Sequence, residues 1–153
     1  MVERWYEDFA LGEEIHSPGK TFTEAEIVDF AFRFDPQPLH IDRPAATAGS
    51  YGGLIASGWH VVAVAFRLFH MTGALGAASL GSPGIDELRW LKPVRPGDTV
   101  RTVVTVAEKR LSRSKPDRGI VIVDYRVINQ DGEAVMSMRG VQLVRRRDGG
   151  GDE

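Results

Sequence analysis

The sequence lacks several residue types and patterns, and each absence excludes a class of function. It contains no cysteine, which excludes thiol catalysis, CxxC redox chemistry and thiolate metal sites. It has no excess of either charge, since 19 Lys and Arg against 21 Asp and Glu give a net charge of −2. A charge so close to zero provides no basic surface for nucleic acid or for an anionic membrane. We therefore expect neither of these among its partners.

Long apolar runs are missing as well. The longest stretch, 59–69, is interrupted by His60 and Arg67 and is shorter than the about 20 residues of a membrane-spanning helix. The first 14 residues are acidic and do not combine a basic start with an apolar run, so they predict no signal peptide. Together these features predict a cytoplasmic protein.

The length and composition predict a single domain. The chain has 153 residues, of which 42% are hydrophobic and 26% charged, as in ordinary globular proteins. We find no internal repeat and no linker with folded sequence on both sides, so we expect one domain over residues 1–144. Residues 145–153 carry no apolar side chain and predict a disordered tail. Residues 1–19 predict an irregular lead-in.

The first helix has a clear start and a clear end in the sequence. Thr23 and Glu26 have the spacing of a capping box, and Phe22 and Ile27 have the spacing of a hydrophobic staple. Apolar residues then follow at helical spacing as far as Asp35. Pro36 disfavours a helical conformation for the residue before it, and Pro38 does the same two residues later. Residues 35–40 are therefore expected to be non-helical and stiff.

Two more helices and a set of strands are expected after this segment. Asp42 can cap a short helix that ends at Ala48, and a long helix is predicted over 57–75. The long helix is apolar on nearly all sides, which is typical of a helix at the centre of a fold. After a glycine-rich loop the apolar period changes to two, with turns at 95–98 and 131–132. The predicted fold class is α+β, in which antiparallel strands wrap a central helix. The expected strands are 88–91, 99–106, 120–128 and 134–144.

The candidate catalytic residues lie on either side of the two prolines. Asp35 and His40 are five residues apart, and proton transfer needs two titratable groups that are held close together. Histidine is suited to this because its unperturbed pKa is about 6.5. The alternative is that Asp35 turns the backbone and His40 is a satisfied polar residue. For an isolated pair at this spacing, the alternative is the more frequent case.

The wider sequence resembles the MaoC-like dehydratases, the (R)-specific enoyl-CoA hydratase group, in three segments that occur in the family's order. The resemblance extends over roughly residues 5–144. The family often has Asn in place of Gln37 and Gly in place of Phe34, and both differences leave the Asp–His pair intact. The three segments are Asp35-Pro-Gln-Pro-Leu-His-Ile-Asp42, Tyr51-Gly-Gly-Leu-Ile-Ala-Ser-Gly-Trp-His60, and Asp86-Glu-Leu-Arg-Trp90 with Pro93-Val-Arg-Pro-Gly-Asp98.

This resemblance implies a hot-dog fold, a long helix wrapped by a curved antiparallel sheet, and a hydro-lyase activity. Asp35 and His40 are implied to hold a water against C3 of a trans-2-enoyl thioester, which gives a 3-hydroxyacyl thioester. Which of the two acts as the base is left open. Gly58 is implied to offer its backbone N–H to the thioester oxygen, as suits the start of a helix.

The remaining roles follow from the same resemblance. Ser57 and Trp59 are expected to bind substrate, and Gln37 and Pro38 to position the loop. No metal or redox cofactor is expected, and coenzyme A enters as part of the acyl-CoA substrate. The chain is expected to form a homodimer or a higher multiple, with the pocket near the subunit interface.

Two other functions stay open at this stage. Related hot-dog proteins hydrolyse acyl-CoA thioesters, and a non-catalytic subunit could complete a partner's site. The histidines at 16, 60 and 70 are expected to be structural, although His60 has a place near the pocket mouth. Ser57 lacks the strand–elbow–helix context of a hydrolase nucleophile.

Overall fold

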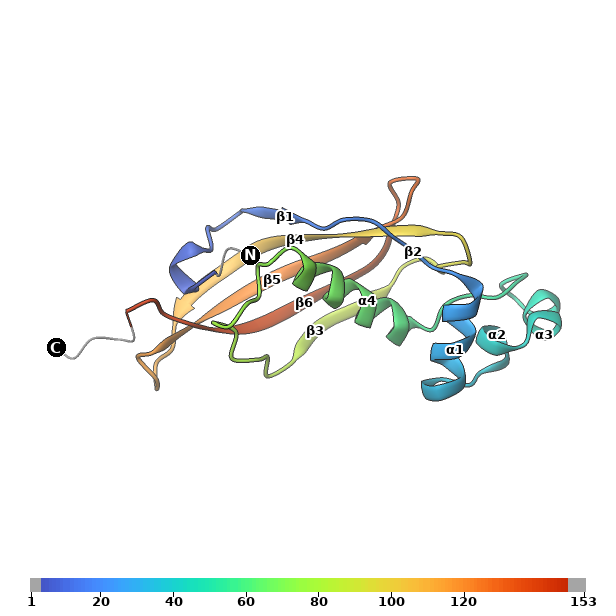
Figure 1. Ribbon diagram of the computed structural model, residues 1–153, viewed down its shortest axis with the longest axis horizontal. Helices are drawn as coiled ribbons and strands as arrows, with labels where there is room; N and C mark the ends of the chain where they lie inside the picture. The colour runs from blue at the N-terminus through green and yellow to red at the C-terminus, as the bar shows by residue number, and fades with distance from the viewer. Residues whose placement is uncertain (1–3, 149–153) are drawn as a thin grey trace.

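The computed structural model describes residues 4–148 and shows a curved antiparallel sheet around one long helix (Figure 1). The strands are β1 (Glu14–His16), β2 (Lys20–Thr21), β3 (Ile85–Trp90), β4 (Thr99–Leu111), β5 (Arg118–Ile128) and β6 (Ala134–Arg145). The helices are the 3-10 turn η1 (Tyr6–Asp8), α1 (Glu24–Phe34), α2 (Pro38–Ile41), α3 (Arg43–Ala48) and α4 (Gly58–Met71). This is the α+β hot-dog arrangement that the sequence predicts, and the fold class is confirmed.

Strands β4, β5 and β6 form an antiparallel meander, and β3, which precedes them in the chain, pairs with β6 at the end of the sheet. Its order is β1-β4-β5-β6-β3, with β2 paired beside β1 on β4, and all pairs are antiparallel. Side chains alternate along β5, so that Val121, Val123, Tyr125 and Val127 are buried. The predicted turn before β6 is present, with Gly132 at a φ of 76°.

Helix α4 lies along the sheet, and only part of its surface is buried. Ala65, Leu68 and Phe69 face the core, and Phe69 meets the Tyr125 ring edge-on at a centroid distance of 5.4 Å. On the opposite side Phe66 and other apolar side chains are exposed. The expectation of a helix buried on all sides is therefore wrong for one face, and the helix also ends earlier, at Met71. Composition shows that a face is apolar, but it does not show whether this same chain covers it.

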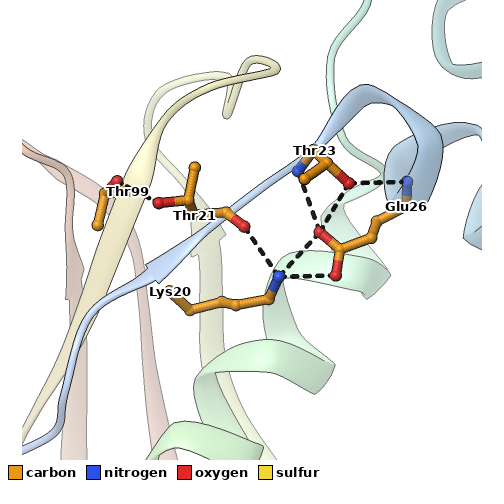
Figure 2. Close-up of polar contacts among 5 residues, drawn as sticks. All are labelled: Lys20, Thr21, Thr23, Glu26 and Thr99. Atoms are coloured by element: carbon orange, nitrogen blue, oxygen red, sulfur yellow. Dashed lines mark hydrogen bonds and ion pairs between the residues drawn. The ribbon is translucent and has the colours of Figure 1, made fainter.

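The start of α1 is tied to the sheet by a polar cluster (Figure 2). Thr23 Oγ1 accepts a hydrogen bond from Glu26 N (3.2 Å), and the Glu26 carboxylate accepts one from Thr23 N (3.0 Å), so the predicted capping box is present. Lys20 Nζ donates to both Glu26 carboxylate oxygens (2.6 and 2.8 Å). Thr21 and Thr99 join β2 to β4 through their hydroxyls (2.7 Å). The helix that ends at Asp35 is thus anchored at its other end.

Residues 4–19 and 145–148 form more contacts than the sequence suggests. Ile15 of β1 pairs with Val104 of β4, so residues 1–19 are not simply an irregular lead-in. Arg145 ends β6, and the Arg147 guanidinium binds the Asp8 carboxylate (2.5 Å). The predicted tail therefore begins too early: residues 145–148 are placed by these contacts, and 149–153 lie outside the described residues. Local composition does not reveal such a contact between the two ends of the chain.

Three short helices gather at one end of the sheet, beside the first turn of α4 (Figure 1). The candidate residues from Asp35 to His40 lie at the end of α1 and in α2, and those from Ser57 to Trp59 lie at the start of α4. Within residues 4–148, no helix is long and apolar enough to cross a membrane.

Candidate active site

Asp35 and His40 lie on either side of a sharp change in chain direction. Asp35 is the C-cap of α1, and its N–H donates to Ala31 O (2.8 Å). Pro36 follows, and Pro38 then begins the four-residue helix α2. The expectation of non-helical chain as far as His40 is wrong, because His40 lies in this helical turn. The first position of a helix needs no N–H donor, so a proline is tolerated there.

The structure brings the two titratable side chains together. His40 Nε2 lies 3.3 Å from Asp35 Oδ2, and the side chains are only 6% and 16% exposed. A carboxylate and an imidazole at this separation share one solvent molecule or one proton. This is the geometry that general acid–base catalysis requires.

The tautomer of His40 is set by a backbone contact. His40 Nδ1 lies 2.7 Å from Ile55 O. A carbonyl oxygen only accepts, so Nδ1 carries a proton and donates it to this bond. In the neutral ring the lone pair is therefore on Nε2, the nitrogen that faces Asp35.

Asp35 is held by two further donors. The Ser57 hydroxyl donates to Oδ2 (2.6 Å), and the Gln37 amide donates to Oδ1 (2.7 Å). The Ser57 bond, the Gln37 bond and the nearby His40 lower the pKa of Asp35 below its usual value, although partial burial opposes them. Asp35 is therefore ionised at neutral pH.

A cleft of about 410 Å³ is lined by His40, whereas Asp35 is not among the residues that line it. It lies between α2, the first turn of α4 and the chain that follows β3. Five of its lining residues are used in the argument below: Gln37, His40, Gly58, Trp59 and Trp90. The cleft thus adjoins His40 and the start of α4, as an acyl site would require.

Ser57 does not face this cleft. It is fully buried (0% exposed), and its hydroxyl is bonded to Asp35. The sequence led us to expect that Ser57 contacts substrate. In the structure its hydroxyl contacts the Asp35 carboxylate instead. Trp59, by contrast, is 58% exposed and lines the cleft as expected for a substrate-binding residue.

Gly58 begins α4 and leaves its N–H without a helical partner. In the described chain the first amide of this helix with such an acceptor belongs to Val61, which donates to Ser57 O (3.1 Å). A Cβ on Gly58 would lie 2.3 Å from Trp90 Cε2, so only glycine allows the indole this close. The Trp90 ring also meets Trp59 edge-on, with centroids 5.4 Å apart.

The other histidines take no part in this arrangement. His60 is buried and stacks on Phe30 at a centroid distance of 4.5 Å. His16 lies in β1 and contacts Glu14 (3.2 Å), and the exposed His70 meets the edge of Phe66. Among residues 4–148, no three His, Asp or Glu side chains come close enough to hold a metal ion.

Two features of the site were not found in the sequence. Trp90 covers Gly58 from β3, and Ile55 O sets the His40 tautomer. Trp90 lies within the third segment of the family resemblance. The sequence therefore drew attention to this position, but it did not show that Trp90 covers Gly58. The Ile55 contact is made by a backbone carbonyl, for which side-chain identity gives no signal.

Comparisons with known proteins match the chain to one domain family and to its solved structures. A family model described as "MaoC like domain" matches residues 8–129. The crystal structure of a MaoC-like dehydratase from Rhodospirillum rubrum is 40% identical, with a TM-score of 0.88 over 94% of this chain and 98% of that chain. An (R)-hydratase from A. caviae, described as involved in PHA biosynthesis, is 26% identical with a TM-score of 0.68, over 88% and 96% of the two chains.

A curated relative extends the comparison. The mesaconyl-CoA hydratase of Cereibacter sphaeroides is 32% identical over 154 aligned positions, which cover 95% of this chain and 42% of that protein. This chain thus spans less than half the length of that relative. The match to the family model and the similarity to these proteins lead to one conclusion: the chain belongs to the MaoC-like domain family.

Proposed function

We propose that the protein is a hydro-lyase that adds water to a trans-2-enoyl thioester of coenzyme A, giving a 3-hydroxyacyl thioester, or catalyses the reverse reaction. The observation that carries the proposal is the Asp35–His40 pair, 3.3 Å apart, in which His40 lines a cleft at the start of α4. The mesaconyl-CoA hydratase and the (R)-hydratase support it, because both relatives are named for hydration.

The chemistry follows from the hydrogen-bonding states of the pair. With Nδ1 protonated, Nε2 of neutral His40 and the ionised Asp35 carboxylate both accept hydrogen bonds. A water that donates to both turns a lone pair outward, toward C3 of the enoyl group. The C3–O bond forms as one O–H bond of the water breaks; its proton passes to the Asp35–His40 pair, and the pair delivers a proton to C2. Asp35 and His40 act as one coupled acid–base unit.

The thioester oxygen gains negative charge as water adds. We assign the Gly58 N–H to this oxygen, because the start of α4 offers an unpaired donor and the positive end of a helix dipole. We also propose that no metal or redox cofactor takes part, since a proton transfer and a hydrogen-bonded oxyanion complete the step.

We propose further that the protein forms a dimer or a multiple of one. Among the described strands, β3 ends the sheet and pairs only with β6, so its outer edge is open. Open edges are normally covered or paired. The exposed apolar face of α4, which includes Trp59 and Phe66, is a second surface suited to a partner. Sedimentation velocity tests this, and a monomer at micromolar concentration would contradict it.

The activity is tested with enoyl-CoAs from four carbons up to bulky ring-bearing acids. We expect the absorbance of the conjugated enoyl thioester to fall, with no release of free thiol and no effect of dialysis against EDTA. Loss of thioester together with stoichiometric thiol would instead support a thioesterase. Activity that appears only after a partner chain is added would support the non-catalytic subunit.

A further inference from the structure

The Asp35 carboxylate is held from outside the catalytic pair. Ser57 Oγ donates to Oδ2 at 2.6 Å, and Gln37 Nε2 donates to Oδ1 at 2.7 Å. We infer that Ser57 is a positioning residue that, together with Gln37, keeps the Asp35 carboxylate aimed at His40. This inference rests on the proposed function, because it assigns Ser57 a role in the same site.

The position of Ser57 makes this contact unusual. Ser57 is the N-cap of α4, where a serine hydroxyl normally accepts a hydrogen bond from an amide of the first turn. No such bond is made here, and the hydroxyl instead donates to a carboxylate 22 residues earlier in the chain. One side chain thus has two effects: it holds Asp35, and it leaves the first amides of α4 uncapped beside the cleft.

The contact also fixes which carboxylate oxygen meets the histidine. Oδ2 receives the Ser57 hydroxyl and is the oxygen that lies 3.3 Å from His40 Nε2. The Gln37 amide holds Oδ1, so rotation of the carboxylate breaks both bonds. Hydrogen bonds to a charged group are the stronger kind, especially where water is excluded.

The two donors differ in their surroundings. Ser57 is fully buried, so no water can replace its hydroxyl without a rearrangement. Gln37 is exposed and lines the cleft, so water can take over part of its role. We therefore expect a larger effect from Ser57 than from Gln37.

The first test compares turnover in Ser57→Ala and Gln37→Ala. We expect kcat to fall by about tenfold to a hundredfold in Ser57→Ala, as for loss of a hydrogen bond to a charged group, and by less in Gln37→Ala. KM should stay within about threefold, because Ser57 does not face the cleft. A change confined to KM would overturn the positioning role. Gln37→Ala, at an exposed site, keeps the test usable if Ser57→Ala does not fold.

Ser17 supplies the matched control. It is another buried serine, whose hydroxyl donates to Pro18 O (2.8 Å) and accepts from Thr102 N (2.9 Å), outside the site. Ser17→Ala should lower stability and leave kcat within about twofold. An equal loss of kcat in Ser17→Ala and Ser57→Ala would show that only general destabilisation is being measured.

The second test does not depend on activity. The Asp35 carboxyl carbon is titrated by NMR in the wild type and in Ser57→Ala, with Asp35→Asn used to assign the signal. We expect the pKa of Asp35 to rise when the hydroxyl is removed, because this bond is the main cause of its low value. If the wild type hydrates no enoyl-CoA but the pKa rises, the proposed function fails and the positioning contact stands. An active wild type with unchanged pKa and kcat in Ser57→Ala overturns the inference alone.

Discussion

Two histidines are buried in this protein, and their surroundings differ in kind. His40 has both ring nitrogens near polar atoms, the Ile55 carbonyl and the Asp35 carboxylate. His60 lies between aromatic rings, stacked on Phe30 and edge-on to Phe22, and its buried Nδ1 has no partner among the described residues. Burial alone therefore does not identify a catalytic histidine.

The comparison shows what distinguishes a working site from a packed one. Around His40 the protein supplies a tautomer anchor, a charged partner and access to a cleft. Around His60 it supplies apolar surface, and burial lowers the pKa of the ring so that it is neutral at neutral pH. The first arrangement suits a group that exchanges protons, as proposed for His40, and the second disfavours the charged form. The following predictions test this contrast from the largest effect to the smallest.

The largest effect is expected at the catalytic pair. Asp35→Asn and His40→Ala should each lower kcat by about a hundredfold or more, because either change removes one half of the acid–base unit. Circular dichroism and thermal unfolding should show a folded protein in both variants. Turnover close to wild type in either variant would refute the role of the pair.

The next effect is expected at Gly58. In Gly58→Ala the new methyl group meets the Trp90 indole, with a Cβ distance of 2.3 Å to Cε2 before any relaxation. We expect kcat/KM to fall by about tenfold or more as the amide and the indole shift apart. The double variant Gly58→Ala with Trp90→Ala should recover part of the loss. No recovery would show that the methyl group acts by another route than the indole.

At His60 we expect a loss of stability rather than of activity. His60→Ala removes a ring packed against Phe22 and Phe30, and the free energy of unfolding should fall by about 2 kcal/mol. Urea denaturation measures this loss, and kcat of the folded variant should stay within about threefold. A hundredfold loss of kcat in a stable His60→Ala protein would remove the distinction between the two histidines.

The smallest effect is expected at Glu26 in α1, the helix that has Asp35 as its C-cap and also carries Phe30, the ring on which His60 stacks. The hydrogen bond from Lys20 and those from Thr23 lower the pKa of Glu26 to about 2, from 4.5. A depressed carboxyl pKa stabilises the fold above the unfolded value, and this contribution is lost as pH falls from about 4.5 to about 2. Glu26→Gln should therefore reduce the loss of stability over that range. Its side chain is 41% exposed, so the change should be small.

Much of the fold could be predicted from local pattern. Thr23 and Glu26 identified the start of α1, and Pro36 identified its end at Asp35. The turn at Gly132 and the alternation along β5 identified the hairpin that leads to β6. These features are local because capping, proline geometry and a period of two act over a few residues.

The site was predicted less completely. Asp35 and His40 were found because two prolines and a family resemblance marked them. Ser57 was placed on the substrate, whereas the structure bonds it to Asp35. The direction of a buried side chain depends on which element packs beside it. The residues that are close in sequence do not indicate which element this is.

The sequence by itself determined the two ends of α1, the order of strands β3 to β6 along the chain and the presence of an imidazole and a carboxylate in one stiff segment. Only the tertiary structure decided that the start of α4 packs beside the end of α1, which brings Ser57 to Asp35 and Trp90 over Gly58. The physical reason is range: backbone preferences act between neighbours, whereas these contacts join segments that meet only when the sheet closes around its helix.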